Sequence, residues 1–403
     1  MPDEVILSYE AARAVVAQQA ALIVKPGVES VPLLAAQGRI LAEDIVADRP
    51  YPPFDRATRD GYAVRSADVI DLSARLRLVG QIKAGTSFDR AIARGECAEI
   101  MTGAPVPEGA DAVVMVEFTR REGETVTVER AASPGENIVP SGSEARAGTT
   151  AVVAGTRLRP AQIAAAATVG RAQVNVYRKP RIAIISTGDE VVAIDRTPGP
   201  VQIRNSNSFS LAAQIAAAGA EPWHLPIAPD EERRLRELIR EGLAADLLLL
   251  SGGVSMGRYD LVEVVLRELE AEFFFTGAKI QPGRPIVFGR VRGKYFFGLP
   301  GNPISTMVGF DLFARPMISA LSGGDAASPL VAQATLAADF KTKTGLTRFL
   351  PAELREGTVQ VIPWQGSGDI FAASRANCYL IIPPDRERLA GGERVSVLLP
   401  GCD

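Results

Sequence analysis

Apolar and polar positions alternate regularly between residues 179 and 321. Short apolar runs are each followed by a glycine-containing polar loop, and then by a segment whose apolar residues have helical spacing. The apolar runs predict strands over residues 182–185, 247–250 and 295–298. The segments between and after them predict helices over residues 208–218, 231–243, 259–269 and 304–321. Apolar strands that alternate with helices indicate a parallel, doubly wound α/β sheet.

Two more helices are predicted outside this region. Ser8 is placed to cap a helix over residues 9–23, and Arg159-Pro160 begins a second helix that Gly170 ends. We expect these two helices to pack on each other in one discontinuous domain. Shorter apolar runs between turn residues predict β structure in the inserted segment. Alternation such as that of residues 393–398 predicts a small β-barrel or sandwich in the C-terminal tail.

The predicted fold is therefore a multidomain α/β protein. Its expected parts are a discontinuous helical domain (1–48 and 149–178), an inserted mostly-β domain (49–148), a doubly wound α/β domain (179–324) and a C-terminal β-barrel domain (325–403). The length of 403 residues agrees with several domains, because single cores rarely grow beyond about 250–300 residues.

Composition narrows the functional classes. Apolar residues make up 47% of the chain and charged residues 23%, which is typical of a folded globular protein. No apolar run approaches the roughly 18 residues of a membrane span, and the first residues do not resemble a signal peptide. The net charge of -3 gives no basic excess for nucleic acid. We therefore expect neither a membrane protein nor a nucleic-acid partner.

Cysteine and histidine usage narrows the chemistry. Cys97, Cys378 and Cys402 are far apart, which argues against a disulfide framework or a zinc site and agrees with a cytoplasmic location. His224 is the single histidine, so catalytic triads and histidine-based metal sites are excluded. It is predicted to end a strand and is assigned no role. Catalysis must rest on carboxylates, hydroxyls and cations.

Three glycine-containing loops follow the predicted strands of the α/β domain. They are Ser186-Thr187-Gly188-Asp189-Glu190, Ser251-Gly252-Gly253-Val254-Ser255 and Leu299-Pro300-Gly301-Asn302-Pro303. Loops at the carboxyl ends of parallel strands meet in one crevice, where open α/β folds bind ligands. Backbone N–H groups at glycines and helix N-termini favour a phosphate. None of the loops is a Walker or G-x-G-x-x-G motif, which argues against ATPase and nicotinamide chemistry.

Four carboxylates belong to these loops or lie beside them. They are Asp189, Glu190, Asp230 and Asp260. Carboxylates that face an anionic ligand require a hard cation between them, and Mg²⁺ held by one or two carboxylates plus phosphates is the usual arrangement. The alternative for Asp230 and Asp260 is that they are favourable acids at helix starts, with Asp230 capping the helix over 231–243.

A set of motifs in a fixed order extends this picture. It comprises Phe54-Asp55-x-x-x-x-Asp60-Gly61-Tyr62-Ala63-Val64, Met101-Thr102-Gly103-Ala104-Pro105-Val106-Pro107, the three loops above, and Gln281-Pro282-Gly283-Arg284-Pro285. The set resembles the MoeA and gephyrin E-domain family of molybdopterin molybdenumtransferases. Each motif alone is common, whereas all of them in order over nearly the whole chain are highly specific.

The resemblance implies an activity and an assembly. Adenylyl-molybdopterin and molybdate would react with Mg²⁺ to give molybdenum cofactor and AMP. The α/β domain would be the molybdopterin-binding domain. The chain would form a homodimer in which this domain of one subunit faces the inserted domain of the other. The molybdopterin adenylyltransferase upstream would be a partner.

The resemblance also assigns roles to residues by position. Catalytic roles fall to Asp60, Thr102, Glu190 and Asp260, and the magnesium ligands are Glu190, Asp230 and Asp260. The ligand-binding residues are Thr187, Gly188, Asp189, Asp230, Ser251, Gly252, Gly253, Ser255, Lys279, Arg284, Pro300, Gly301, Asn302, Pro303 and Ser367.

The chain departs from the family pattern in two places, and both concern cations near the expected site. Gly277 and Gln281 stand where many members have lysines, so Lys279 and Arg284 are the nearby cations and oxyanion binding is either rearranged or weakened. The run Arg56-Ala57-Thr58-Arg59 replaces a neutral segment. Its arginines either supply anion affinity from a new direction or are simply solvated.

Two alternative functions compete with this one. A molybdopterin adenylyltransferase resembles residues 179–324 alone and usually has Gly-Gly-Thr-Gly where this chain has Gly252-Gly253-Val254-Ser255. An inactive pterin-binding scaffold would keep the fold without activity, but the joint presence of the four catalytic candidates argues against it. Sequence does not distinguish molybdate from tungstate, since the two oxyanions share shape and charge.

Overall fold

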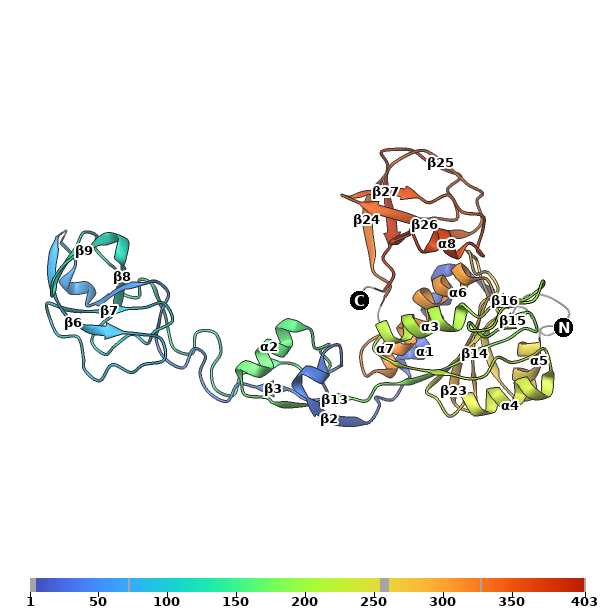
Figure 1. The fold of residues 1–403 in the computed structure, drawn as a ribbon, viewed down its shortest axis with the longest axis horizontal. Helices are drawn as coiled ribbons and strands as arrows, with labels where there is room; N and C mark the ends of the chain where they lie inside the picture. The colour runs from blue at the N-terminus through green and yellow to red at the C-terminus, as the bar shows by residue number, and fades with distance from the viewer. Residues whose placement is uncertain (1–4, 72, 254–260, 327, 402–403) are drawn as a thin grey trace.

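The computed structural model describes residues 5–71, 73–253, 261–326 and 328–401. The chain is elongated (Figure 1): the inserted β-rich unit lies at one end, a small unit lies in the middle, and the α/β unit with the C-terminal barrel lies at the other end. Within the described residues, no helix is both long and apolar enough to cross a membrane.

The sheet of the α/β unit has six strands and confirms the doubly wound fold. Their order is β17 (Glu221–His224), β14 (Arg181–Ser186), β18 (Leu247–Ser251), β23 (Lys294–Leu299), β22 (Val287–Val291) and β19 (Glu272–Phe275). The first four strands are parallel, but β22 is antiparallel to both neighbours. Arg292 and Gly293 join β22 to β23 with φ of 49° and 78°, as in a two-residue hairpin turn. The sheet is thus mixed rather than wholly parallel.

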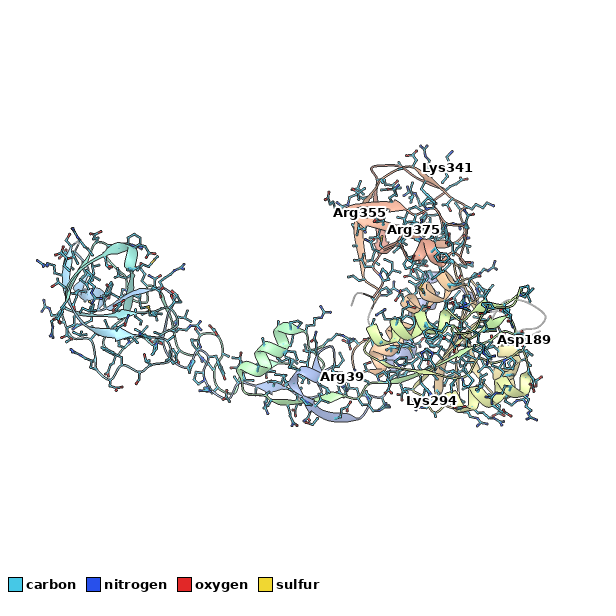
Figure 2. The ribbon with its side chains drawn as sticks, viewed as in Figure 1. Arg39, Asp189, Lys294, Lys341, Arg355 and Arg375 are labelled. Atoms are coloured by element: carbon cyan, nitrogen blue, oxygen red, sulfur yellow. The ribbon has the colours of Figure 1, made fainter. Side chains whose placement is uncertain are left out.

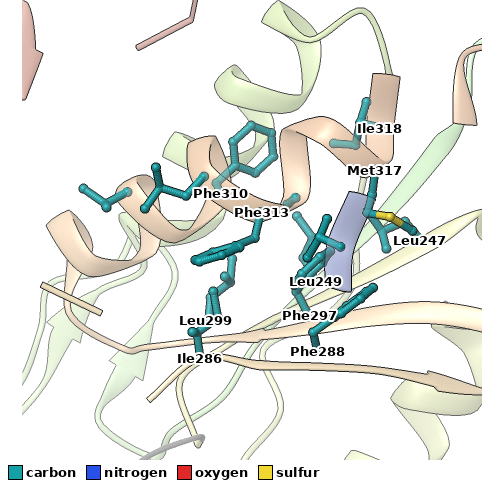
Figure 3. Packing of buried hydrophobic residues seen from close by; sticks show 14 of the residues in the cluster. Leu247, Leu249, Ile286, Phe288, Phe297, Leu299, Phe310, Phe313, Met317 and Ile318 are labelled. Atoms are coloured by element: carbon teal, nitrogen blue, oxygen red, sulfur yellow. The ribbon is translucent and has the colours of Figure 1, made fainter. Parts of the chain in front are cut away.

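Helices cover both faces of this sheet, because successive residues of its strands point to opposite sides. Ile182 and Ile184 belong to one core, and Ala183 and Ile185 to the other. The first core is covered by α1 (Tyr9–Ala21), α3 (Asn207–Ala217), α6 (Pro303–Gly309), the π-helix η4 (Phe310–Ala314) and α7 (Arg315–Leu321). The second is covered by α4 (Glu232–Gly242) and α5 (Leu261–Glu268). Figure 3 shows aromatic and aliphatic side chains packed between the sheet and the consecutive helices α6, η4 and α7.

The expected packing of the first two helices is wrong. Ser8 caps α1 as predicted, since its hydroxyl accepts from the Ala11 N–H at 3.1 Å. However, α1 buries Tyr9 and Val16 in the α/β core against α7, whereas α2 (Pro160–Thr168) packs in the middle unit. Helical periodicity predicts which face of a helix is buried, but it does not predict which element that face packs against. We propose that α1 belongs to the α/β domain and that the expected domain limits hold for the rest of the chain.

The middle and inserted units have separate cores. The middle unit joins β2 (Val28–Pro32) to β13 (Gln173–Tyr177) and β3 (Ile45–Val46) to β12 (Thr150–Val152). The inserted sheet has the order β8 (Ala112–Met115), β5 (Gly61–Val64), β7 (Glu96–Ile100), β6 (Ala74–Ile82), β10 (Thr125–Val128) and β9 (Thr119–Glu122). Two clusters pack on its opposite faces. The inserted segment is β-rich, as expected.

The C-terminal strands form a closed barrel, which confirms that prediction. In order around it they are β26 (Thr347–Arg355), β27 (Thr358–Val361), β24 (Val331–Leu336), β30 (Arg394–Leu398) and β28 (Cys378–Ile382), which returns to β26. Three barrel side chains, Phe349, Tyr379 and Leu398, belong to the same hydrophobic cluster as the α/β core. The Phe349 and Tyr9 rings pack edge to face, with 5.2 Å between their centroids. The barrel is therefore fixed to the α/β unit by shared core.

Gly61 offers a test of the inserted sheet. A Cβ at this position would overlap the Val114 carbonyl oxygen and stand 2.8 Å from the carbonyl carbon on the adjacent strand β8. We expect Gly61→Ala to lower the free energy of unfolding of this unit by about 3 kcal/mol, because backbone must move. Urea unfolding, followed by hydrogen exchange in the inserted unit, would measure this change in the free energy of unfolding. The control Gly27→Ala has nothing within 4 Å of the added Cβ and should change stability by less than about 0.5 kcal/mol. Equal stability of the two variants would contradict the β5–β8 packing.

Candidate functional site

A pocket of about 360 Å³ opens at the carboxyl ends of the parallel strands β14, β18 and β23. All three predicted loops line it, so the predicted convergence is confirmed. The expected ligand-binding residues that it brings together are Thr187, Gly188, Asp230, Ser251, Gly252, Gly253, Pro300, Gly301, Asn302 and Pro303, with Glu190 beside them. Ser255 and Asp260, which were also expected at this site, lie outside the described residues.

Backbone hydrogen bonds tie the three loops together. The Thr187 N–H donates to the Ser251 carbonyl at 3.0 Å, and the Gly252 N–H donates to the Leu299 carbonyl at 3.0 Å. Gly252 and Gly253 have φ of 93° and 63°, and a Cβ on either would stand 2.9 Å from Thr187 Oγ1. Glycine is required at both positions because the backbone is left-handed and approaches a side chain closely. These contacts join the three loops into one pocket wall.

The residues at the start of α3 complete the pocket, and sequence reasoning missed them. Asn207 donates through Nδ2 to the Ser251 hydroxyl at 2.9 Å and to the Gly301 carbonyl at 2.7 Å, so it bridges two of the loops. Asn205 accepts from the Ser186 hydroxyl at 3.0 Å and from the Ser208 N–H at 3.1 Å. The signal in the sequence was the polar run Arg204-Asn205-Ser206-Asn207 directly before a predicted helix.

Two buried polar atoms in this wall have no hydrogen-bond partner among the residues that the structure describes. They are Thr187 Oγ1 and Asn207 Oδ1, and Thr187 is only 6% exposed. Both residues line the pocket. Buried polar groups are nearly always satisfied in folded proteins, and exceptions concentrate at functional sites. These orphaned atoms fit a pocket that takes a polar ligand.

The acidic residues are arranged differently from expectation in one respect. Asp230 does not cap α4: the N-cap is Glu231, without a side-chain cap bond, and Asp230 lines the pocket instead. Its own N–H donates to Asp189 Oδ1 at 3.1 Å. Asp189 therefore supports the pocket from behind and does not line it. The Glu190 carboxylate lies directly over Gly188, where a Cβ would overlap it.

The pocket fits a magnesium ion that arrives with a phosphate. Glu190 and Asp230 are two exposed carboxylates on its wall. Within the described part of the chain, no group of three or more Asp, Glu, His or Cys residues could hold a metal without further ligands. Two carboxylates suffice for Mg²⁺ when phosphate oxygens and water complete the octahedron.

A second cavity of about 450 Å³ adjoins the first. Both are lined by Pro285, Pro300 and Asn302. Of the remaining expected ligand-binding residues, Arg284 and Ser367 line this second cavity, and Lys279 is exposed and lines neither. The second cavity lies between the α/β unit and the barrel, since Trp364, Gly366 and Ser367 close one side.

Asp60 and Thr102 are brought together, but far from the pocket. The Thr102 N–H donates to Asp60 Oδ1 at 2.6 Å. This hydrogen bond lowers the pKa of Asp60 below its usual value, so the charged form that strengthens the contact is present at neutral pH and is lost as pH falls through that lowered pKa. Both residues are exposed on the inserted unit, at the opposite end of the molecule from Asp189 (Figure 2).

The arginines beside Asp60 differ from each other. Arg56 forms an ion pair with Glu144 at 3.1 Å, which holds it against the inserted unit. Arg59 is exposed. The segment that carries both is fixed, because the Gly103 N–H donates to the Ala57 carbonyl at 2.8 Å.

Comparisons with known proteins agree with this architecture. Sequence profiles of the MoeA N-terminal region (domain I and II), a probable molybdopterin binding domain and the MoeA C-terminal region (domain IV) match residues 7–170, 183–320 and 333–399. The molybdopterin molybdenumtransferase of Bacillus subtilis is 35% identical, with 90% of this chain and 87% of that protein aligned. That of Staphylococcus aureus is 33% identical over 98% and 95%.

A solved structure covers the same extent. The molybdopterin biosynthesis MoeA protein of Pyrococcus horikoshii aligns over 98% of this chain and 99% of its own, with a TM-score of 0.77 and 35% identity. A second structure of MoeA from that organism gives a TM-score of 0.79 at 29% identity. The three profiles, the full-length relatives and the shared fold together show that this chain belongs to the MoeA family.

Proposed function

We propose that the chain is a molybdopterin molybdenumtransferase, which inserts molybdenum from molybdate into adenylyl-molybdopterin and releases AMP. The names of its full-length relatives support this activity. The observation that carries the proposal is the pocket, in which three glycine loops and two carboxylates meet at the carboxyl ends of a parallel sheet. Such a wall suits a phosphoanhydride better than a neutral substrate.

The proposed function assigns a different role to each group of pocket residues. The N–H groups of Thr187, Gly188 and Gly252 already donate to backbone carbonyls, so other backbone N–H groups of the glycine loops would orient the phosphates. Thr187 Oγ1 and Asn207 Oδ1 would gain partners from the ligand. Glu190 and Asp230 would hold Mg²⁺, with Asp260 as the third proposed ligand. When bound, Mg²⁺ supplies Lewis-acid stabilisation of charge on the phosphoanhydride. Arg284 and Ser367 on the second cavity are the proposed contacts for the oxyanion side of the ligand.

We further propose that two copies form one active site. Asp60 and Thr102 belong to the proposed catalytic set but lie at the far end of the same chain. A homodimer that places the inserted unit of one copy over the pocket of the other would complete the site. A cytoplasmic location is supported by the buried free thiols of Cys97 and Cys378. The upstream adenylyltransferase is the proposed donor of the substrate.

One assay tests the proposal against its main rival. The purified chain is mixed with adenylyl-molybdopterin, Mg²⁺ and either molybdate or tungstate, and AMP and metal-loaded cofactor are measured. We expect AMP release that requires both Mg²⁺ and an oxyanion, and the two oxyanions give the metal preference. Pyrophosphate release from molybdopterin and ATP without any oxyanion would instead identify a molybdopterin adenylyltransferase. Binding of the substrate without either reaction would identify a scaffold.

A further inference from the structure

Arg204 lines the pocket but has no part in the roles proposed so far. It ends β16 (Ile203–Arg204), which pairs in parallel with β15 (Val191–Val192). We call residues 191–204 the flap. The flap forms one rim of the pocket, because Val191, Ile203 and Arg204 all line it. Arg204 is therefore a cation on the rim of the pocket.

The flap holds Arg204 in a defined position. The Ile203 N–H donates to the Glu190 carbonyl at 2.8 Å, and the Asn205 N–H donates to the Val192 carbonyl at 2.8 Å. These bonds fix the backbone on both sides of Arg204. Its Nε donates to the carbonyls of Ile194 and Arg196 at 3.1 and 3.2 Å, which fixes the plane of the guanidinium. Among the described residues, the side-chain hydrogen bonds of Arg204 all come from Nε. Its two Nη groups can therefore donate to a ligand.

The charged side chains of the pocket wall indicate a binding role for Arg204. Among the described residues that line the pocket, the carboxylates are Glu190 and Asp230, and Arg204 is the one cation. An anionic ligand is repelled by the carboxylates unless positive charge opposes them. A guanidinium presents paired N–H groups that match phosphate oxygens, which an ammonium does not. Arg204 combines this geometry with a fixed orientation.

We propose that Arg204 binds a phosphate of the bound pterin nucleotide through its Nη groups and thereby couples the flap to the ligand. This inference rests on the proposed function and adds a specific phosphate-recognition residue to it. The phosphate belongs either to the adenylyl half or to the pterin half of the substrate. The two halves can be tested apart, as AMP and as molybdopterin.

The test measures binding of AMP and of molybdopterin to the full-length chain in the presence of Mg²⁺. We expect Arg204→Met to weaken one or both ligands about 10- to 100-fold, the usual worth of hydrogen bonds to a charged group. Arg204→Lys should lose most of this affinity, because it keeps the charge without the planar fork. The matched control is Arg196→Met on the same flap, where the backbone carbonyl and not the side chain contacts Arg204. This control should bind as the wild type does.

The outcomes separate the two proposals. Weaker binding of AMP alone assigns the adenylyl phosphate, and weaker binding of molybdopterin alone assigns the pterin phosphate. Unchanged binding of both ligands by Arg204→Met overturns the inference while leaving the proposed function intact. An equal loss for adenosine, which has no phosphate, would reveal a structural role for Arg204 and would also overturn it. A wild-type chain that binds neither ligand would overturn the proposed function and the inference together.

Discussion

Glu190→Gln is expected to lower Mg²⁺-dependent AMP release about 100-fold, since a Lewis acid contributes several kcal/mol and each 1.36 kcal/mol is tenfold in rate. The Glu190 carboxylate lies over Gly188 on the pocket wall and lines the space for the ligand. A neutral amide of the same shape keeps the packing but binds a hard cation poorly. Raising the Mg²⁺ concentration should therefore restore part of the rate.

Two comparisons make this prediction decisive. Asp195→Asn removes an exposed carboxylate from the flap that does not line the pocket, and it should retain the wild-type rate. The thermal unfolding midpoint of Glu190→Gln should match that of the wild type, because this exchange preserves side-chain volume at an exposed position. A Glu190→Gln protein that turns over normally at limiting Mg²⁺ would remove Glu190 from the proposed metal site.

Activity is expected to return when two inactive variants share one dimer. Asp60→Asn keeps an oxygen that can accept from the Thr102 N–H but loses the charge, and it should lower AMP release about tenfold or more. Co-expression of Glu190→Gln and Asp60→Asn chains with different tags allows the heterodimer to be isolated. If each site combines the pocket of one copy with the inserted unit of the other, one of the two sites is intact. The heterodimer should then have about half of the wild-type activity.

The reciprocal heterodimer is the control. It pairs a wild-type chain with a chain carrying both Glu190→Gln and Asp60→Asn, so each shared site contains one substituted residue and activity should be nearly absent. If instead each chain formed its own site, the two heterodimers would exchange results: the first would be inactive and the second half-active. That exchange, or a chain that is strictly monomeric, would contradict the shared active site.

The sequence predicted the position of the pocket because strand direction decides it. Continuous apolar runs identified parallel strands, and glycine loops at their carboxyl ends had to converge. The hairpin of β22 and β23 was missed, although Arg292-Gly293 between two apolar runs is a recognisable two-residue turn. Periodicity likewise located the buried face of α1 but assigned it to α2, because packing partners are set by the tertiary fold.

Individual site residues were harder to predict than the pocket. Asp230 was expected both to cap a helix and to bind the ligand; it does not cap α4, whereas it does line the pocket. Asn205 and Asn207 were missed because their function depends on hydrogen bonds to loops far away in the sequence, which no local pattern displays. The order of the motifs therefore predicted where the pocket lies, whereas long-range hydrogen bonds determine which side chains line it.

The cluster shared by α1, the α/β sheet and the barrel has a consequence for biosynthesis. Tyr9 near the start of the chain and Leu398 near its end belong to one core. A ribosome delivers Leu398 only after every segment between these two residues has been made, whereas the inserted unit can assemble its own clusters earlier. We therefore expect part of this core to stay exposed until the barrel strands have been made, so that it closes after the core of the inserted unit.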